Sequence, residues 1–160
     1  MNKRRIVAKW ILFAFAMIVT IFIIVNSCMN GNQSGASSSR LADLCKNIIN
    51  FFKHDLINDT NYETFHSVIR KLVGHFGLFM MDAIFLSWSL YLFDMKKWWY
   101  KIIISLSFGL FIALISEFTQ IFVPGRVGSY LDILIDYSGY ILGFSVIFLV
   151  GYIKYRKNKS

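Results

Sequence analysis

Four long apolar segments divide the chain, and each has about the length that an α-helix needs to cross a lipid bilayer. They cover residues 6–25, 72–93, 102–123 and 130–152. A membrane-spanning helix requires roughly 20 predominantly apolar residues. The pattern therefore predicts an all-α protein, a polytopic membrane helical bundle with four transmembrane helices. We expect a single domain, residues 1–160, whose first segment is a retained anchor; a cleaved signal is the alternative for that segment.

Two different patterns occur in the long outer loop between the first two spans, residues 26–71. Residues 30–39 consist only of Asn, Gln, Gly, Ser and Ala, a composition typical of a flexible linker. From residue 40 to residue 57, apolar side chains recur at helical spacing. They are Leu41, Leu44, Cys45, Ile48, Ile49, Phe52 and Leu56. This second pattern predicts an extracellular amphipathic helix that lies in the outer interface of the membrane or covers the bundle.

The loop ends with signals for the start of a helix. Residues 58–61 read Asn-Asp-Thr-Asn, which predicts a turn. Thr60 is followed three residues later by Glu63, in the form of a capping box. We therefore expect a helix to begin outside the membrane and to continue through the second span.

The composition supports a membrane protein and argues against nucleic-acid binding. Apolar side chains make up 56% of the chain, which is too many for a small soluble domain to cover with a polar surface. The formal charge of +8 comes from basic residues that flank the spans and form no continuous patch. We therefore predict no nucleic-acid partner and a lipid bilayer as the surroundings.

The positions of these basic residues predict the orientation of the chain. With the N-terminus in the cytoplasm, the inner segments hold 11 of the 17 Lys and Arg residues. They are Lys3, Arg4, Arg5, Lys9, Lys96, Lys97, Lys101, Lys154, Arg156, Lys157 and Lys159. Cytoplasmic segments carry such an excess, and interfacial aromatics such as Trp10, Trp98 and Trp99 fall at the same ends of the spans. We therefore predict a multi-pass protein with both termini in the cytoplasm.

Polar and small residues form a stripe along each of three spans. The stripes are Lys71, His75 and Asp82 in and just before the second span, Gly109, Ala113, Ser116, Glu117 and Gln120 in the third, and Asp132, Asp136, Gly139 and Gly143 in the fourth. An ionisable residue near the centre of a spanning helix costs about 2.5 to 3.5 kcal/mol, so it needs a partner or a wet cavity. The stripes predict a polar pocket in the outer half of the bundle. Gly139 and Gly143 form a GxxxG pair, which permits close helix contact.

The turn between the last two spans adds a cation to this pocket. Residues 124–129 contain one Pro and two Gly and predict a tight turn. Arg126 within it can reach back toward Glu117 or Asp132, and it can also bind a phosphate. The predicted ligand-binding residues are Lys71, His75, Glu117, Gln120, Arg126, Asp132 and Asp136. For Asp82, a structural interpretation is that the carboxyl group is neutral or paired with His75.

Neither a metal nor a cofactor is predicted. The chain contains no zinc-ligand spacing and no Ser/His/Asp nucleophile motif. Any catalysis would therefore use the residues of the pocket directly, with Glu117, His75 and Asp132 as the candidate catalytic residues.

The same region carries a family resemblance. Residues 117–143 contain the patterns E-x-x-Q, P-x-R and D-x-x-x-[N/D]-x-x-G-x-x-x-G, which together resemble the signature of the VanZ-like membrane protein family. Arg70 and Lys71, followed by His75, resemble the other motif of that family. The likeness extends over about residues 62–150 and depends on charged positions as well as on hydrophobicity.

The resemblance implies a cell-envelope protein in the cytoplasmic membrane of a Gram-positive bacterium. The family takes its name from a member linked to low-level resistance to teicoplanin and related lipoglycopeptide antibiotics, and no biochemical activity follows from that name. The chain departs from the family at Asp136, where Asn is more usual, and at residues 77–79, where acidic and aromatic residues are more usual.

We expect the pocket to bind an anionic amphiphile in the outer leaflet. Lipid-linked cell-wall precursors and lipoglycopeptides belong to this class, and binding one would lower susceptibility to the antibiotic. In this hypothesis Arg126 and Lys71 hold the anionic group, and the spans hold the acyl chain. The ligand and the oligomeric state stay open.

The alternatives give the same residues other tasks. An intramembrane hydrolase or transferase acting on a lipid-linked envelope substrate would use Glu117 or Asp132 as general base, His75 as acid or proton shuttle, and Arg126 to stabilise negative charge. A small transporter or proton-coupled channel would use Asp82. A purely structural hairpin would pair Arg126 with Asp132 and Glu117.

Overall fold

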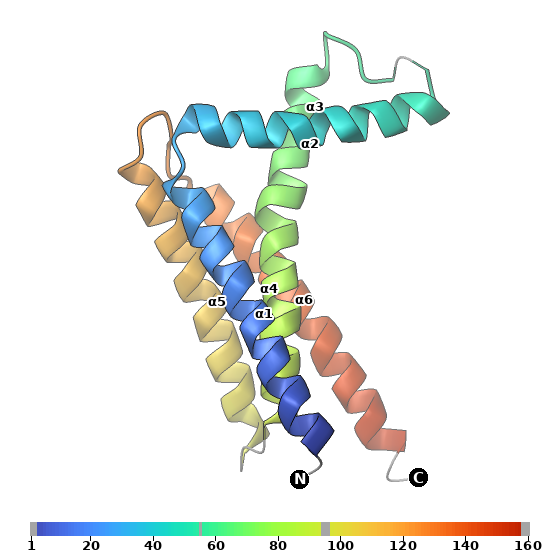
Figure 1. The fold of residues 1–160 in the computed structure, drawn as a ribbon, viewed down its shortest axis with the longest axis vertical. Coiled ribbons are helices and arrows are strands. Elements are labelled where there is room, and N and C mark those ends of the chain that lie inside the picture. Colours follow the sequence, from blue (N-terminus) through green and yellow to red (C-terminus); the bar gives the residue numbers. More distant parts are fainter. Residues whose placement is uncertain (1–2, 55, 94–96, 158–160) are drawn as a thin grey trace.

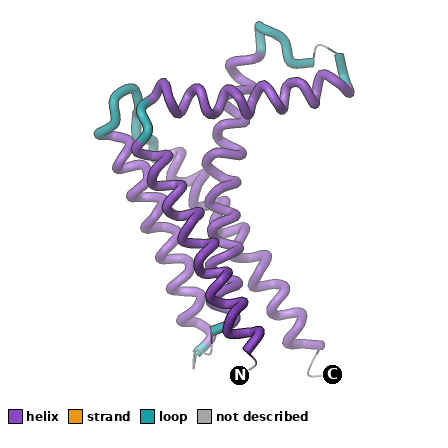
Figure 2. Tube along the Cα trace, viewed as in Figure 1, coloured by secondary structure: helices purple, strands orange, loops and turns teal. Residues whose placement is uncertain are grey.

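The computed structural model describes residues 3–54, 56–93 and 97–157 of the chain. In chain order its elements are α1 (Lys3–Cys28), α2 (Gly31–Phe52), α3 (Tyr62–Ile69), the π-helical segment η1 (Arg70–Gly77), α4 (Leu78–Leu92), α5 (Trp98–Ile121) and α6 (Tyr130–Lys157). Within the described ranges the chain is helical apart from its connecting loops and contains no strand (Figure 2). The prediction of an all-α protein is confirmed.

Helices α1, α4, α5 and α6 pack side by side into a bundle, and α2 lies across one end of it (Figure 1). Helix α4 contacts each of the other three helices of the bundle. Both termini lie at the end opposite α2 (Figure 1). We call these two ends of the bundle the α2 end and the terminal end.

The four predicted spans are confirmed as long apolar helices. Among the described residues, the helices long and apolar enough to cross a membrane are Lys3–Cys28, Tyr62–Leu92, Trp98–Ile121 and Tyr130–Ile153. Many apolar side chains on the outside of the bundle are exposed; Ile18, Ile21 and Phe118 are 60%, 62% and 62% exposed. Such a surface suits lipid tails, because a helix in a bilayer satisfies its backbone internally and turns apolar side chains outward.

Close contact between α6 and the η1–α4 segment depends on two glycines. A Cβ atom at Gly139 would lie 2.2 Å from the carbonyl oxygen of Phe76, and one at Gly143 would lie 2.3 Å from that of Met80. Both distances are too short for any side chain. The predicted GxxxG contact is therefore confirmed, and it brings α6 against the helix that carries His75.

Polar side chains inside the bundle are paired between helices. Asp82 is fully buried, and its Oδ1 accepts a hydrogen bond from Thr20 Oγ1 of α1 at 3.0 Å. Of the two alternatives for Asp82, the pair with His75 does not form, because His75 Nδ1 lies 3.0 Å from Asp136 Oδ1 of α6 instead. His75 belongs to η1, and the wider π-helical turns change the direction of its side chain relative to a regular α-helix.

The flexible linker predicted for residues 30–39 is also wrong, since helix α2 begins at Gly31. Asn30 caps this helix by accepting a hydrogen bond from the backbone NH of Gln33 at 2.9 Å. Ser34 accepts a hydrogen bond from Arg126, and Ser38 lies 2.8 Å from His66 Nε2. Partners in other elements thus stabilise a helix that composition alone does not favour.

The second half of α2 has the amphipathic character that its spacing predicted. Leu44, Ile48 and Phe51 are 61%, 61% and 79% exposed. This half of the helix reaches beyond the bundle (Figure 1), so these apolar side chains have no protein to cover them among the described residues. The surface is of the kind that lies in a membrane interface.

The helix that leads into the second span starts close to the predicted position but without the predicted cap. It begins at Tyr62, and its N-cap residue Asn61 makes no side-chain capping hydrogen bond. The Thr60 hydroxyl donates to Asn58 Oδ1 rather than taking part in a capping box with Glu63. The helix then runs without a break through α3, η1 and α4, as expected.

Replacing Gly139 by Ala should lower the free energy of unfolding by about 1 to 3 kcal/mol, because the new Cβ forces α6 away from η1. Gly35→Ala is the matched control, since no described atom lies within 4 Å of a Cβ at that position and Ala favours a helix. Thermal unfolding of both variants in detergent, followed by circular dichroism, measures the difference. Equal midpoints for the two variants would contradict the tight contact.

Candidate functional site

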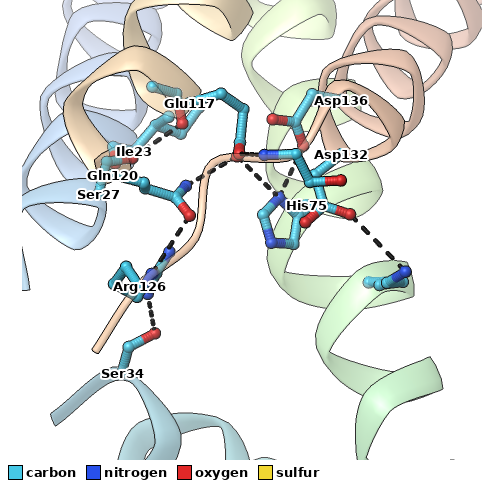
Figure 3. Close-up of polar contacts among 12 residues, drawn as sticks. Ile23, Ser27, Ser34, His75, Glu117, Gln120, Arg126, Asp132 and Asp136 are labelled. Carbon is cyan, nitrogen blue, oxygen red and sulfur yellow. Dashed lines mark hydrogen bonds and ion pairs between the residues drawn. The ribbon is translucent and has the colours of Figure 1, made fainter. Parts of the chain in front are cut away.

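The candidate site lies at the α2 end of the bundle, where η1, the last turns of α5, the first turns of α6 and the loop of residues 122–129 meet (Figure 3). This loop bends at Gly125, whose φ of +74° is a conformation that other residues rarely adopt. The start of α2 is fastened to the loop by a hydrogen bond from the NH of Gly31 to the carbonyl of Pro124 at 3.1 Å. A Cβ at Gly31 would lie 2.2 Å from the carbonyl oxygen of Gly125. The two glycines therefore allow the loop and α2 to touch backbone to backbone.

Glu117 is the most completely held carboxylate of the site. Its side chain is 3% exposed. Gln120 Nε2 donates to its Oε1 at 2.7 Å, and the backbone NH of Ser129 donates to its Oε2 at 3.0 Å. The spacing of three places Gln120 about one helical turn beyond Glu117, whereas Ser129 reaches it only because the loop folds back. Both carboxylate oxygens are thus held in fixed directions.

Arg126 reaches this carboxylate only through Gln120. Its Nε donates to Gln120 Oε1 at 3.2 Å, and its Nη1 donates to Ser34 Oγ of α2. The direct contact expected with Glu117 or Asp132 does not form, because the Gln120 amide stands between the guanidinium and Glu117. Burial lowers the pKa of Arg126 from its usual value, and the positive charge of Arg70 lowers it further. An Arg side chain keeps its proton in proteins, so two like charges face this region.

His75 joins the helices at the centre of the site. It is 8% exposed, and its Nδ1 lies 3.0 Å from Asp136 Oδ1 and 4.0 Å from Glu117 Oε1. Figure 3 shows its ring between the carboxylates of Glu117, Asp132 and Asp136. Asp136, the departure from the family pattern, is fully buried and is the closest partner of this imidazole.

Lys71 lies at the margin of the site. Its Nζ is 3.8 Å from Asp132 Oδ1, and the two side chains are 47% and 15% exposed. Of the residues predicted from sequence, the structure brings together His75, Glu117, Gln120, Asp132 and Asp136. Arg126 joins them through Gln120, and Lys71 contacts the group only at Asp132.

A cavity of about 210 Å³ opens beside this group, between α1, α2 and η1. Its polar lining comprises Asn26 at the end of α1 and six further residues, namely Ser34, Ser37, Ser38, Arg70, His75 and Arg126. We call these six residues and the space they line the basic cavity. Its other walls include the apolar side chains of Phe22, Leu41, Val73 and Leu78. Arg70 and Arg126 form no ion pair with a carboxylate of the described residues.

Sequence reasoning missed four residues of the basic cavity. The sequence could have indicated Arg70, because this residue stands next to Lys71 in the same motif. Only the helix geometry decides which of the two side chains faces the cavity. No sequence pattern indicated Ser34, Ser37 and Ser38, since serines in a Gly/Ser-rich stretch are typical of a flexible linker.

A larger groove of about 490 Å³ lies toward the terminal end, between α4, α5 and α6. Its lining is largely aromatic and aliphatic, with Trp98, Phe144 and Phe148 among its residues. The Lys101 ammonium at its edge donates to the carbonyls of Tyr91 and Phe93 at 3.2 Å and 2.7 Å, at the end of α4. The groove therefore offers a surface for lipid tails and less polar chemistry than the basic cavity.

The arrangement could also hold a metal ion. One ring nitrogen of His75 and one carboxylate oxygen from each of Glu117 and Asp132 lie within 4.8 Å of one another. These donors come from three separate elements, η1, α5 and α6, which is why no ligand spacing is visible along the chain.

Comparison with known proteins identifies the family. A sequence model described as VanZ/LLP1 matches residues 10–151, which include every residue of the site. No curated protein and no solved structure shows a significant match to the chain. The family match covers most of the chain and extends beyond the motifs that carry the resemblance. The chain therefore belongs to the VanZ/LLP1 family.

Proposed function

We propose that the protein binds the anionic headgroup of an amphiphile in its basic cavity, at the outer leaflet of the bacterial cytoplasmic membrane. The observation that carries the proposal is the pair of guanidinium groups, Arg70 and Arg126, that line one cavity and have no carboxylate partner among the described residues. Two partly buried cations side by side repel each other, and an anion between them would remove that repulsion.

The chemistry of the lining favours a phosphate or carboxylate. Arg binds both groups with two parallel N–H bonds, and serine hydroxyls can donate to the remaining oxygens. Ser34, Ser37 and Ser38 lie on α2, so a bound anion would connect this helix to η1 and to the loop that carries Arg126. Lys71, which the sequence suggested for this task, lies outside the cavity and beside Asp132.

An amphiphile fits better than a free anion because the cavity is polar on one side only. Phe22, Val73 and Leu78 come from α1, η1 and α4 and form apolar walls that continue into the lipid-facing surface of the bundle. The headgroup would occupy the basic cavity, and the acyl or prenyl chain would lie against these helices. Lipid-linked cell-wall precursors and lipoglycopeptides both combine an anionic group with such a chain.

The charge distribution supports an outward direction of the cavity. Excess Lys and Arg at the terminal end favours a cytoplasmic location for that end, with both termini inside. The α2 end then faces outward. The exposed apolar half of α2, which includes Leu44, Ile48 and Phe51, would lie in the outer interface and keep the basic cavity at headgroup level.

One observation supports an intramembrane hydrolase or transferase as a second candidate function. His75 lines the basic cavity and also contacts Asp136, so a proton acceptor oriented by a carboxylate faces the place of the ligand. Glu117 fits the role of general base less well, because both of its oxygens already accept hydrogen bonds. In this reading the substrate is the same lipid-linked amphiphile, and Arg126 stabilises the developing negative charge.

Replacing Arg70 by Gln should weaken the binding of an anionic amphiphile by about 10- to 100-fold, because a hydrogen bond to a charged group contributes roughly 1.5 to 3 kcal/mol. Lys71→Gln is the matched control: it removes the same charge one residue away, outside the cavity. A fluorescent polyprenyl phosphate titrated into the purified protein in nanodiscs measures both. An equal loss for the two variants would show that net charge, and not the basic cavity, holds the ligand.

In a teicoplanin-susceptible Gram-positive host, expression of the wild-type chain should lower susceptibility, and Arg126→Ala should abolish that effect. Glu117→Gln should keep part of it, because a Gln side chain can still accept the bond from the NH of Ser129. Antibiotic susceptibility, with membrane levels matched by immunoblot, gives the comparison. A complete loss in Glu117→Gln, together with turnover of a lipid-linked precursor by the wild type, would favour the enzyme over the binding protein.

A further inference from the structure

Three metal-ligating side chains from three elements converge beside the basic cavity. His75 comes from η1, Glu117 from α5 and Asp132 from α6. One donor atom from each lies within 4.8 Å of the others. We call these three residues the ligand cluster, and Figure 3 shows the His75 ring between the Glu117 and Asp132 side chains.

Unsatisfied oxygens next to the ligand cluster give an independent indication of a cation. Asp136 is fully buried, and its Oδ2 has no hydrogen-bond partner in the described part of the chain. Asp132 Oδ1 likewise accepts no hydrogen bond there, and the Lys71 ammonium lies 3.8 Å from it. Figure 3 shows Asp136 directed toward His75. A buried carboxylate oxygen without a donor is costly, and a bound cation removes that cost.

The cluster gathers more carboxylates than close cationic partners among the described groups. Glu117, Asp132 and Asp136 bring three carboxylates to one imidazole. The ion pair of Lys71 with Asp132 is long, at 3.8 Å, and half-exposed, while Arg126 is bonded to Gln120 and Ser34. A divalent cation at the centre would supply the positive charge that this group of carboxylates lacks.

The surroundings also orient the donors of the cluster. Gln120 and the backbone of Ser129 hold the Glu117 carboxylate, and Asp136 contacts the imidazole of His75. This contact is made by Nδ1, and it fixes the orientation of the imidazole ring beside the carboxylates of the cluster. Donor atoms on one zinc ion lie at most about 4.4 Å apart, twice a bond length of roughly 2.2 Å, so small side-chain movements would close the site.

From these observations we infer that His75, Glu117 and Asp132 form a binding site for one divalent transition-metal ion. One imidazole nitrogen and two carboxylate oxygens suit Zn²⁺ or Mn²⁺ better than the all-oxygen preference of Ca²⁺ or Mg²⁺. Three protein ligands leave a position open for a further ligand, as in metal sites that contact a substrate. The inference does not depend on the proposed function, because it concerns the metal alone.

The test is metal binding by the purified full-length protein in detergent, after removal of metal with a chelator. The wild type should bind one equivalent of Zn²⁺ in calorimetry, and it should bind Mn²⁺ with loss of the free-ion electron paramagnetic resonance signal. Asp132→Asn and Glu117→Gln should each weaken the binding at least tenfold. Asp82→Asn is the matched control, since Asp82 is a fully buried carboxylate, hydrogen-bonded to Thr20, that lies outside the cluster.

A second measurement covers a variant that folds poorly. Saturating Zn²⁺ should raise the unfolding midpoint of the wild type and of Asp82→Asn, because a ligand that binds only the folded state stabilises it. Asp132→Asn, which replaces the most exposed of the three ligands, should show no such rise. The inference is overturned if the wild type binds neither ion saturably, or if Asp132→Asn binds as the wild type does.

Discussion

The burial of Glu117 is the constraint on which the α2 end of the bundle depends. A carboxylate inside a membrane helix loses its water, so its oxygens need donors from the protein. One donor, Gln120, lies on the same helix, but the other is the backbone NH of Ser129, beyond the loop. That bond requires residues 122–129 to fold back over the end of α5. The carboxylate thereby determines where α6 begins and which of its side chains face η1.

A chain of hydrogen bonds connects Glu117 to α2 and thereby fixes the position of that helix. The amide of Gln120 turns its nitrogen to Glu117, which leaves its oxygen to accept from Arg126, and Arg126 then donates to Ser34. Because a neutral amide separates the guanidinium from the carboxylate, Arg126 forms no direct ion pair with Glu117. The site thus consists of an acidic ligand cluster and a basic cavity next to it. His75 belongs to both.

Asp136 adds a third carboxylate to the surroundings of His75. The VanZ-like pattern more usually has Asn at this position, which would leave two carboxylates around His75 rather than three. Here the third carboxylate is fully buried and contacts the imidazole directly. The glycines of α6 make this contact possible, because Gly139 and Gly143 let the helix approach the backbone of Phe76 and Met80. Close packing in lipid thus decides the electrostatics of the site.

The sequence alone determined the four spans, the turn at residues 124–129, the GxxxG contact and most of the side chains that gather at the α2 end. These features follow from hydrophobic length and residue spacing, which are local properties of the chain. Only the tertiary structure decided that residues 31–39 are helical, that His75 pairs with Asp136 rather than Asp82, and that Arg70 rather than Lys71 lines the basic cavity. Each of these outcomes depends on a partner far away in sequence or on the π-helical turns of η1. A local sequence pattern cannot predict such partners, because their hydrogen bonds and packing contacts form only after the helices have packed together.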